Sequence, residues 1–230
     1  MSMPFSVFCD FDGTITKADT IDYLLEKLAD PSWQDIEARW SEGEIGSREC
    51  LAKQIPLIKG GWNAVLEALE GVELDPTFAG FAAWCHENGM PLFVVSEGLI
   101  PIVHALLKRD NIHVDGVWAN DIDEHADGSL SMKFPYAPQD KACQAGLCKC
   151  QVLNNVMPVS SSRIVIGDGQ SDLCWATEAT LLFAKSKLLK HCQYNNIPHI
   201  PFENFTTIQQ VLAGKGEVHE PKTAFFQYRQ

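Results

Sequence analysis

The chain has 230 residues, enough for one large domain or for a core domain with a smaller insertion. Hydrophobic residues make up 46% and charged residues 21%, which is an ordinary globular balance. The net charge of −12 argues against sequence-independent binding to nucleic acid, because that requires clustered lysine and arginine. No apolar run approaches the ~18 residues of a membrane span and no secretion signal is evident, so we expect a soluble, cytoplasmic protein.

Short apolar runs alternate with helical patterns along the chain. The runs predict strands of a parallel sheet that is buried on both faces, because almost all their residues are apolar. The order predicts an α/β fold with a doubly wound parallel sheet, in which ligands bind beyond the carboxyl ends of the strands. The predicted strands cover residues 5–9, 91–95, 163–167 and 180–184, and predicted helices cover 75–89, 100–110 and 170–179.

A long insertion separates the first two predicted strands. It has roughly eighty residues, far more than one crossover helix requires. We expect a core domain of residues 1–15 and 76–230, with a helical cap domain inserted at residues 16–75. Residues 116–134 predict a β-hairpin, because Ala-Asp-Gly-Ser supplies its turn. The predicted cap helices cover residues 19–29, 31–43, 47–58 and 62–71.

Acidic residues follow two of the predicted strands. Asp10 and Asp12 come directly after the first strand, although a turn there would need only one Asp-Gly pair. Asp168 and Asp172 follow the strand at 163–167 in the same way. Bringing carboxylates together costs repulsion and desolvation unless a cation neutralises them. Because the donors are all oxygen, the cluster predicts a hard ion such as Mg²⁺ rather than zinc or copper.

Four short motifs, in this order, resemble those of the haloacid dehalogenase superfamily of phosphotransferases. They are DFDGTIT at residues 10–16, VVSEG at 94–98, a downstream lysine, and GDGQSD at 167–172. The predicted cap between the first two motifs resembles the phosphoserine-phosphatase-like branch. The resemblance implies a Rossmann-like core and a Mg²⁺-dependent phosphatase that forms an aspartyl phosphate.

The resemblance also implies roles for individual residues. Asp10 would attack phosphorus, and Asp12 would protonate the leaving oxygen and then activate water. Mg²⁺ would lie between Asp10, the backbone carbonyl of Asp12 and Asp168, and Asp172 would support it. Ser96 would hydrogen-bond the phosphoryl group, although it also suits a helix N-cap. The expected substrate-binding residues are Asp19, Ser96, Glu97, Gly98 and Lys149.

Two lysines compete for the third motif. Lys141 and Lys149 both precede the last motif, and either would supply positive charge to the phosphate and the nucleophilic carboxylate. We favour Lys149, because the cysteine-rich segment around it resembles the phosphatases of methionine salvage that act on 2-hydroxy-3-keto-5-methylthiopentenyl-1-phosphate. Residues 40–50 and the tail from residue 183 support the same resemblance. It predicts a small phosphorylated metabolite as the substrate.

Phosphoserine is the main alternative substrate. Asp19 lies where phosphoserine phosphatases place an acid for the substrate amino group. Gln54 falls where those enzymes carry an arginine for the substrate carboxylate, and Arg48 is near but out of register. Because this arginine is missing, we consider phosphoserine a less favoured substrate than the methionine-salvage phosphate. A phosphotransferase or mutase is a further alternative, whereas a non-catalytic binding module disagrees with four intact motifs.

The chain contains eight cysteines, and without a secretion signal these indicate reduced thiols. Cys143, Cys148 and Cys150 lie close together, but their spacing differs from that of a zinc ribbon and a fourth ligand is missing. We therefore expect packed or inert thiols there rather than a metal site. The other five are expected to be small core residues: Cys9, Cys50, Cys85, Cys174 and Cys192.

Overall fold

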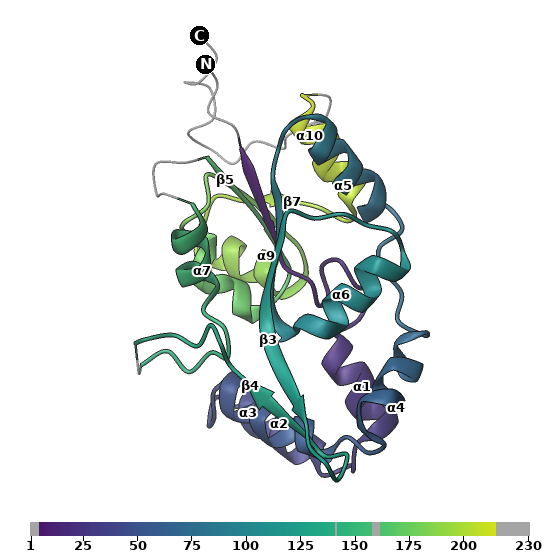
Figure 1. Cartoon of the computed structure of the whole chain (residues 1–230). Coiled ribbons are helices and arrows are strands. Elements are labelled where there is room, and N and C mark those ends of the chain that lie inside the picture. The colour runs from purple at the N-terminus through teal and green to yellow at the C-terminus, as the bar shows by residue number, and fades with distance from the viewer. Residues whose placement is uncertain (1–4, 141, 158–161, 215–230) are drawn as a thin grey trace.

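A computed structural model describes residues 5–140, 142–157 and 162–214 (Figure 1). Its centre is a seven-stranded sheet in the order β4-β3-β2-β1-β5-β6-β7. All neighbouring strands are parallel except β3 and β4, which form the predicted hairpin. The α/β doubly wound fold predicted from the sequence is confirmed. The strands are β1 (Ser6–Cys9), β2 (Leu92–Leu99), β3 (Gly116–Glu124), β4 (Leu130–Lys133), β5 (Arg163–Gly167), β6 (Leu181–Ala184) and β7 (Ile200–Pro201).

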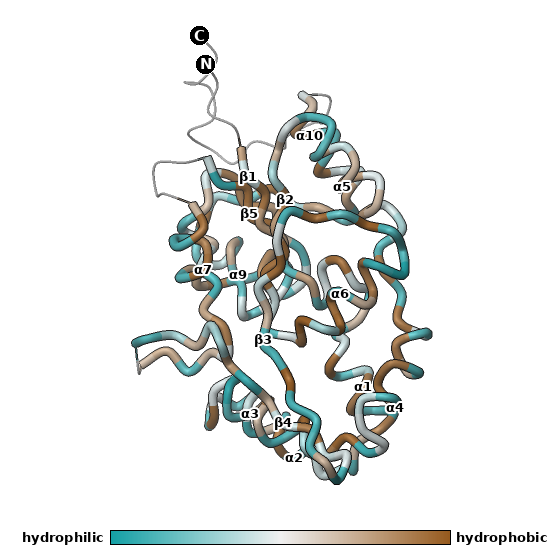
Figure 2. The backbone as a smooth tube through the Cα atoms, in the orientation of Figure 1, coloured by the Kyte–Doolittle hydropathy of each residue, from teal (hydrophilic) through white to brown (hydrophobic). Residues whose placement is uncertain are grey.

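Helices cover both faces of the sheet. Along β1, Val7 and Cys9 face one hydrophobic cluster, while Phe8 between them faces the other. This alternation explains why most residues of the central strands are apolar (Figure 2). One cluster contains side chains of α5 (Phe78–Glu87), α6 (Ile100–Arg109) and α10 (Phe205–Leu212). The other contains side chains of α7 (Lys149–Val156), α8 (Leu173–Ala176) and α9 (Ser186–Tyr194).

The insertion between β1 and β2 is helical, as predicted. An antiparallel bridge between Thr16 and Leu74 joins the point where the chain leaves the sheet to the point where it returns. The β3–β4 hairpin extends toward these helices, and β4 contacts α3 and the 3₁₀ turn η1 (Figure 1). The inserted elements are α1 (Thr20–Leu28), α2 (Trp33–Ser41), α3 (Ser47–Gln54), η1 (Ile55–Leu57) and α4 (Gly61–Leu69).

Two predicted boundaries were wrong near the strand ends. Strand β2 continues to Leu99, beyond its predicted end at residue 95, with an irregular register against β3 between Val95 and Leu99. Leu99 is the N-cap of α6, so Ser96 lies inside the strand and does not cap a helix. The helix predicted at 170–179 is a 3₁₀ turn η2 (Gln170–Asp172) followed by the short α8.

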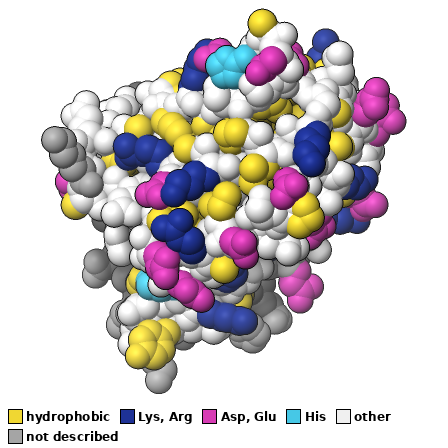
Figure 3. Space-filling view, turned by 90° about the horizontal axis from the view of Figure 1, so that it is seen from below, with side chains coloured by type: hydrophobic (Ala, Val, Ile, Leu, Met, Phe, Trp, Pro, Cys, Tyr) yellow, Lys and Arg dark blue, Asp and Glu magenta, His cyan; other side chains and the backbone are white. Residues whose placement is uncertain are grey.

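The lengths of the helices and the charges on the surface indicate whether the protein has features for binding a membrane or a nucleic acid. Among the described residues, no helix is both long enough and apolar enough to cross a bilayer. Figure 3 views the molecule from the end that carries the inserted helices, and charges of both signs lie interspersed there. On this face the described side chains therefore form no continuous basic patch of the kind that phosphate backbones require.

Candidate active site

The acidic strand ends meet because β1 and β5 are neighbours in the sheet. Cys9 pairs with Ile166, and the Asp10 amide donates a 2.9 Å hydrogen bond to the Ile166 carbonyl. Asp168 follows β5 directly, so its side chain emerges beside that of Asp10. Carboxylate oxygens of Asp10, Asp168 and Asp172 all lie within 4.8 Å of one another.

Asp10 is buried with one oxygen held by the protein. Its Oδ1 accepts a 2.8 Å hydrogen bond from the Phe11 amide and forms an ion pair with the Lys149 ammonium at 2.7 Å. Its Oδ2 accepts none from the described residues, and the side chain lines the cavity described below. Burial and the nearby Asp172 carboxylate raise the pKa of Asp10, and Lys149 opposes this shift.

Lys149 is the positive group of the site. Its side chain is completely buried, and Nζ lies 2.7 Å from an oxygen of Asp10 and 2.7 Å from one of Asp172. Nζ also lies 5.0 Å from the centre of a Trp175 ring. Burial alone would lower the pKa of Lys149, but the two carboxylates outweigh it and raise that pKa, so the group stays charged. Lys141, the alternative from the sequence, lies outside the described residues.

Asp12 is held by Thr20 and Ser96. Its Oδ1 accepts hydrogen bonds from the amide and the hydroxyl of Thr20, and its Oδ2 accepts one of 2.8 Å from the Ser96 hydroxyl. A Cβ atom at Gly98 would lie 2.5 Å from Oδ2 of Asp12, so a side chain at position 98 would displace this carboxylate. The Thr20 contact was missed, because no sequence pattern links a helix's first residue to an acid eight positions earlier.

Asp168 and Asp172 make different contacts. Asp168 accepts a 2.8 Å hydrogen bond from the Thr14 hydroxyl, and burial raises its pKa. Asp172 is completely buried with both oxygens engaged, one by Lys149 and the other by the amides of Asp168 and Gly169. Asp172 therefore braces the loop that presents Asp168. Sequence reasoning gave Thr14 no role, although it follows the first motif's glycine.

The donor chemistry of this cluster fits a hard divalent cation. Four carboxylates, those of Asp10, Asp12, Asp168 and Asp172, lie near the ammonium groups of Lys149 and Lys185, which leaves negative charge in excess. Asp10 and Asp168 line the cavity, and the backbone carbonyl of Asp12 accepts no hydrogen bond from the described residues. Mg²⁺ prefers such oxygen ligands.

A cavity of about 400 Å³ lies between the strand ends and helices α1, α2 and α3. The sheet side supplies Asp10, Asp12, Gly98 and Asp168. The inserted helices supply an apolar group and an acidic group, with Gln54 beside the latter. The apolar group is Ile21, Trp40, Cys50 and Leu51, and the acidic group is Asp19, Asp22 and Glu37.

Two residues predicted to bind substrate also hold the structure together. Asp19 caps α1, because its Oδ1 accepts hydrogen bonds from the amides of Ile21 and Asp22. Burial and the Asp12 charge raise the pKa of Asp19. Glu97 Oε1 accepts hydrogen bonds of 2.9 Å from the Ser47 hydroxyl and from the Gly146 amide, and so connects α3 to the segment before α7.

Arg48 and Gln54 differ in their access to the cavity. The Arg48 guanidinium donates hydrogen bonds to the carbonyls of Ala145 and Cys143, and it does not line the cavity. Gln54 does line it, and donates a 3.0 Å hydrogen bond to Glu37. Within the described residues, the position that sequence comparison assigned to a carboxylate-binding arginine thus holds a neutral amide.

One expectation about the cysteines was wrong. Cys9, Cys50, Cys85 and Cys192 are buried as predicted, but Cys174 is exposed. Its thiol lies beside those of Cys148 and Cys150, which come from the cysteine-rich segment. Cys143, predicted as the third member of that group, does not belong to the cluster found among the described residues. The sequence separation between α7 and α8 concealed this contact.

Comparison with known proteins agrees with the fold and the predicted family. A family model for haloacid dehalogenase-like hydrolases matches residues 7–177. Two relatives, from Bacillus thuringiensis (strain Al Hakam) and Bacillus cereus (strain 03BB102), are named 2-hydroxy-3-keto-5-methylthiopentenyl-1-phosphate phosphatase. Each is 31% identical over 214 residues, covering 91% of this chain and 96% of the relative.

Solved structures share the fold at lower identity. A substrate-bound phosphoserine phosphatase has a TM-score of 0.66 and 19% identity, covering 83% of this chain and 90% of its own. A phospho-aspartyl intermediate analogue of phosphoserine phosphatase has a TM-score of 0.68 and 18% identity, covering 93% and 99%. The chain therefore belongs to the haloacid dehalogenase-like hydrolase family and is a phosphatase of that family.

Proposed function

We propose that this phosphatase hydrolyses a small phosphomonoester through an aspartyl phosphate formed on Asp10. The observation that carries the proposal is the asymmetry of the Asp10 carboxylate. Lys149 and the Phe11 amide hold Oδ1, whereas Oδ2 accepts no hydrogen bond from the described residues and is the proposed attacking atom of this cavity-lining side chain. A nucleophile fixed in this way has already lost the rotational freedom that an attack would otherwise cost.

The proposed reaction has two displacements. In the first, an oxygen of Asp10 forms a bond to phosphorus while the bond from phosphorus to the substrate oxygen breaks. Asp12 gives its proton to that departing oxygen. In the second, Asp12 takes a proton from water, the water oxygen attacks phosphorus, and the bond to Asp10 breaks to release phosphate.

Neighbouring groups orient the acid and stabilise charge. Thr20 and Ser96 hold the Asp12 carboxylate in one position next to the nucleophile. Lys149 places a positive charge against Asp10, which limits the repulsion between the carboxylate and an incoming phosphate. Phosphoryl transfer depends largely on such positioning and charge stabilisation. Ser96 is buried and its hydroxyl donates to Asp12, so the proposed hydrogen bond from Ser96 to the phosphoryl group would require that hydroxyl to turn away from Asp12.

Mg²⁺ is the proposed cofactor. Asp10, the backbone carbonyl of Asp12, and Asp168 would hold it, and Asp172 would keep Asp168 in place through the backbone. When bound, Mg²⁺ supplies charge neutralisation for the phosphate oxygens. The excess of carboxylates over ammonium groups at the strand ends supports this assignment.

Residues 16–75 are proposed to act as a cap over the cavity. The Thr16–Leu74 bridge brings the two connections of this segment together, and the segment supplies one wall of the cavity. A cap that closes on the substrate would exclude bulk water during transfer to Asp10 and admit water afterwards. The core domain would then be residues 1–15 and 76–230.

The proposed substrate is 2-hydroxy-3-keto-5-methylthiopentenyl-1-phosphate. The named relatives act on it, and they match almost the whole chain at 31% identity. The apolar side of the cavity, with Trp40 and Leu51, offers a surface for a methylthio group. Gln54 is neutral and the Arg48 guanidinium does not line the cavity, so neither position offers the arginine that would bind the carboxylate of phosphoserine; among the described residues, the cations that line the cavity are Lys17 and Lys187.

Phosphoserine is the second candidate because of the acidic side of the cavity. Asp19, Asp22 and Glu37 would favour a substrate that carries an ammonium group. Those acids favour phosphoserine, whereas the absence of a lining arginine among the described residues disfavours it.

A phosphate-release assay with Mg²⁺ tests both levels of the proposal. The panel contains the methylthiopentenyl phosphate, phosphoserine, phosphoethanolamine and a phosphosugar. We expect the first to have the highest kcat/KM. A higher value for phosphoserine would transfer the assignment to the second candidate, and recovery of a phosphorylated acceptor without free phosphate would identify a phosphotransferase or mutase.

A further inference from the structure

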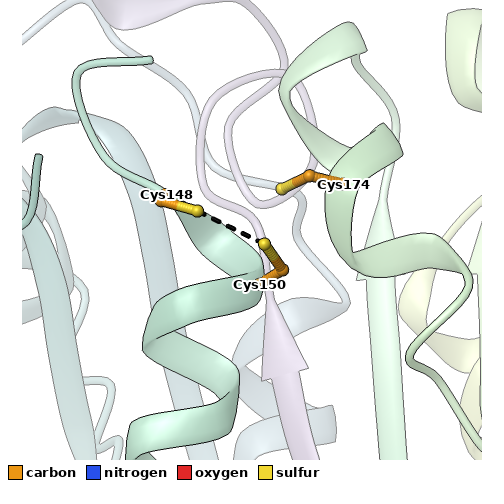
Figure 4. Close-up of side chains that lie close together, drawn as sticks. All are labelled: Cys148, Cys150 and Cys174. Carbon is orange, nitrogen blue, oxygen red and sulfur yellow. Dashed lines mark hydrogen bonds between the residues drawn. The ribbon is translucent and has the colours of Figure 1, made fainter. Parts of the chain in front are cut away.

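Three cysteine thiols converge outside the phosphatase site. Cys148 is the N-cap of α7, Cys150 lies in its first turn, and Cys174 lies in α8. Their sulfur atoms all lie within 4.8 Å of one another, and Sγ of Cys148 is 3.3 Å from Sγ of Cys150. Figure 4 shows the side chains of these two helices directed into the space between them.

The exposure of the three thiols differs from that of packed core cysteines. Cys148 is buried, Cys150 is partly exposed and Cys174 is exposed, so the cluster opens to solvent on one side. A core cysteine would serve as a small apolar residue surrounded by carbon atoms. Here three sulfurs are each other's neighbours at a surface, where an ion can enter without opening the core.

We propose that Cys148, Cys150 and Cys174 form a three-thiolate site for one thiophilic metal ion such as Zn²⁺. Thiolates bound about 2.3 Å from a tetrahedral zinc ion lie roughly 3.8 Å from one another. The Cys148–Cys150 separation of 3.3 Å is slightly shorter than that value, and the other two separations are no longer than 4.8 Å, so metal binding requires only small rotations of the side chains. The open side leaves a fourth position for water, as in zinc sites with three protein ligands.

Binding of a metal ion to the three cysteines releases their thiol protons. The Cys148–Cys150 contact is a hydrogen bond between thiols. One Zn²⁺ therefore displaces one proton from each of the three thiols and forms three Zn–S bonds, with no electron transfer. Zinc affinity should rise with pH as a consequence.

A disulfide is the competing account of this cluster. A bond between Cys148 and Cys150 would leave Cys174 without a role, although its sulfur lies in the same group. It would also require an oxidant, whereas metal binding uses all three thiols as they stand. The three-fold convergence from two helices therefore favours the metal.

The position of the cluster links it to the phosphatase site. Cys148 and Cys150 flank Lys149 in the chain, and Cys174 comes two residues after Asp172. The ion pair between Lys149 and Asp172 thus lies between the same two segments that the metal would join. A bound ion would hold the start of α7 to α8 and stabilise the folded protein.

Cadmium and zinc binding to the reduced protein would test the proposal. Titrations with Cd²⁺ are carried out in excess Mg²⁺, and the ultraviolet thiolate-to-cadmium charge-transfer band reports sulfur ligation. Competition with a chromophoric chelator gives the Kd for Zn²⁺. Cys174→Ser removes an exposed ligand, and Cys143→Ser is the matched control, because Cys143 lies in the same cysteine-rich segment outside the cluster.

The wild-type protein and Cys143→Ser should bind one Cd²⁺ with equal band intensity, and Zn²⁺ should raise their Tm. Cys174→Ser should lose about a third of the band and bind Zn²⁺ at least tenfold more weakly, since even loss of a ligand's hydrogen-bonding neighbour costs roughly 10–100-fold. Equal Cd²⁺ spectra for both variants would overturn the proposal. So would a disulfide between Cys148 and Cys150, found by mass spectrometry, in protein purified without reductant.

Discussion

The Lys149 ammonium nitrogen lies 2.7 Å from Oδ1 of Asp10, and the lysine side chain has no exposed surface. A buried charge is stable only when its partners remain, because desolvation of an isolated ion costs several kcal/mol. Asp172 supplies the second partner at 2.7 Å. The helix start that carries Lys149 is therefore fixed by ion pairs to the end of β1 and to the turn η2 that follows β5.

Lys149→Ala should lower kcat/KM by roughly a hundredfold or more, by the loss of one group that stabilises charge in the transition state. It should also destabilise the fold by about 3–5 kcal/mol, because two buried carboxylates lose their counter-ion. Steady-state kinetics and urea unfolding measure the two effects. Lys141→Ala is the control and should change kcat/KM only slightly, and the reverse ranking of the two variants would move the motif role to Lys141.

Asp10→Asn should abolish turnover while the protein stays folded. An amide does not attack phosphorus, and it binds a divalent cation weakly. The fold should persist because Asp172 still pairs with Lys149. Phosphate release and circular dichroism make the measurement. Activity well above that of a mock purification from cells without the gene would contradict the nucleophile assignment.

The fold was predictable because the central strands are buried on both faces. Val7 and Phe8 face opposite layers, so the alternation that marks a half-exposed strand is replaced by a continuous apolar run. The end of β2 was not predictable in the same way. Ser96 and Glu97 are polar and resemble a loop, but they belong to β2, and their side chains make hydrogen bonds with Asp12 and Ser47.

The candidate site was predictable only where its residues lie in short motifs. Asp10 and Asp168 stand directly after strands, and the order of strands in the sheet brings them together. Thr20 and Cys174 depend on contacts between segments that the sequence does not connect. Cys174 sits among apolar neighbours in the chain, so its periodicity indicated the core, while the start of α8 turns it outward.

Removal of divalent cations should stop turnover. Oxygen donors with excess negative charge bind Mg²⁺, so EDTA should remove activity and Mg²⁺ should restore it. Ca²⁺ should be a poor substitute, because its looser and larger coordination shell does not position the phosphate in line. Phosphate release after chelation and dialysis measures this. Full activity in metal-free protein would show that the acids have another use.

Asp22 should make stability depend on pH. Partial burial together with Glu37 and Asp12 raises the pKa of Asp22 to about 6 in the folded protein, against about 3.9 in an unfolded chain. The folded state therefore binds this proton more tightly, and the corresponding stability is present below pH 4 and lost as the pH rises through 6.

Asp22→Asn should consequently raise Tm more at pH 8 than at pH 4. Thermal unfolding at both pH values measures the difference. Glu67→Gln, on the exposed side of α4, is the control and should show no such dependence. An Asp22→Asn effect of the same size at pH 4 and pH 8 would show that the ionisation of Asp22 beside Glu37 and Asp12 does not affect stability.

Trp40 should determine how well a substrate with an apolar tail binds. It lines the cavity from α2, beside Leu51 of α3. Truncation to alanine would remove a large apolar surface worth about 1.5–3 kcal/mol of binding, which corresponds to roughly 10–100-fold in KM. Because Trp40 belongs to the inserted helices and not to the strand ends, kcat should change much less than KM.

The comparison needs two substrates. Trp40→Ala should raise KM for 2-hydroxy-3-keto-5-methylthiopentenyl-1-phosphate, while KM for phosphoglycolate, which has no apolar tail, should stay near the wild-type value. Leu66→Ala is the control, because Leu66 is an exposed apolar residue of α4 that does not line the cavity. Equal increases in KM for both substrates would mean that Trp40 supports the cap as a whole. A fall in kcat alone would mean that Trp40 contributes to closure of the cap and not to recognition of the methylthio group.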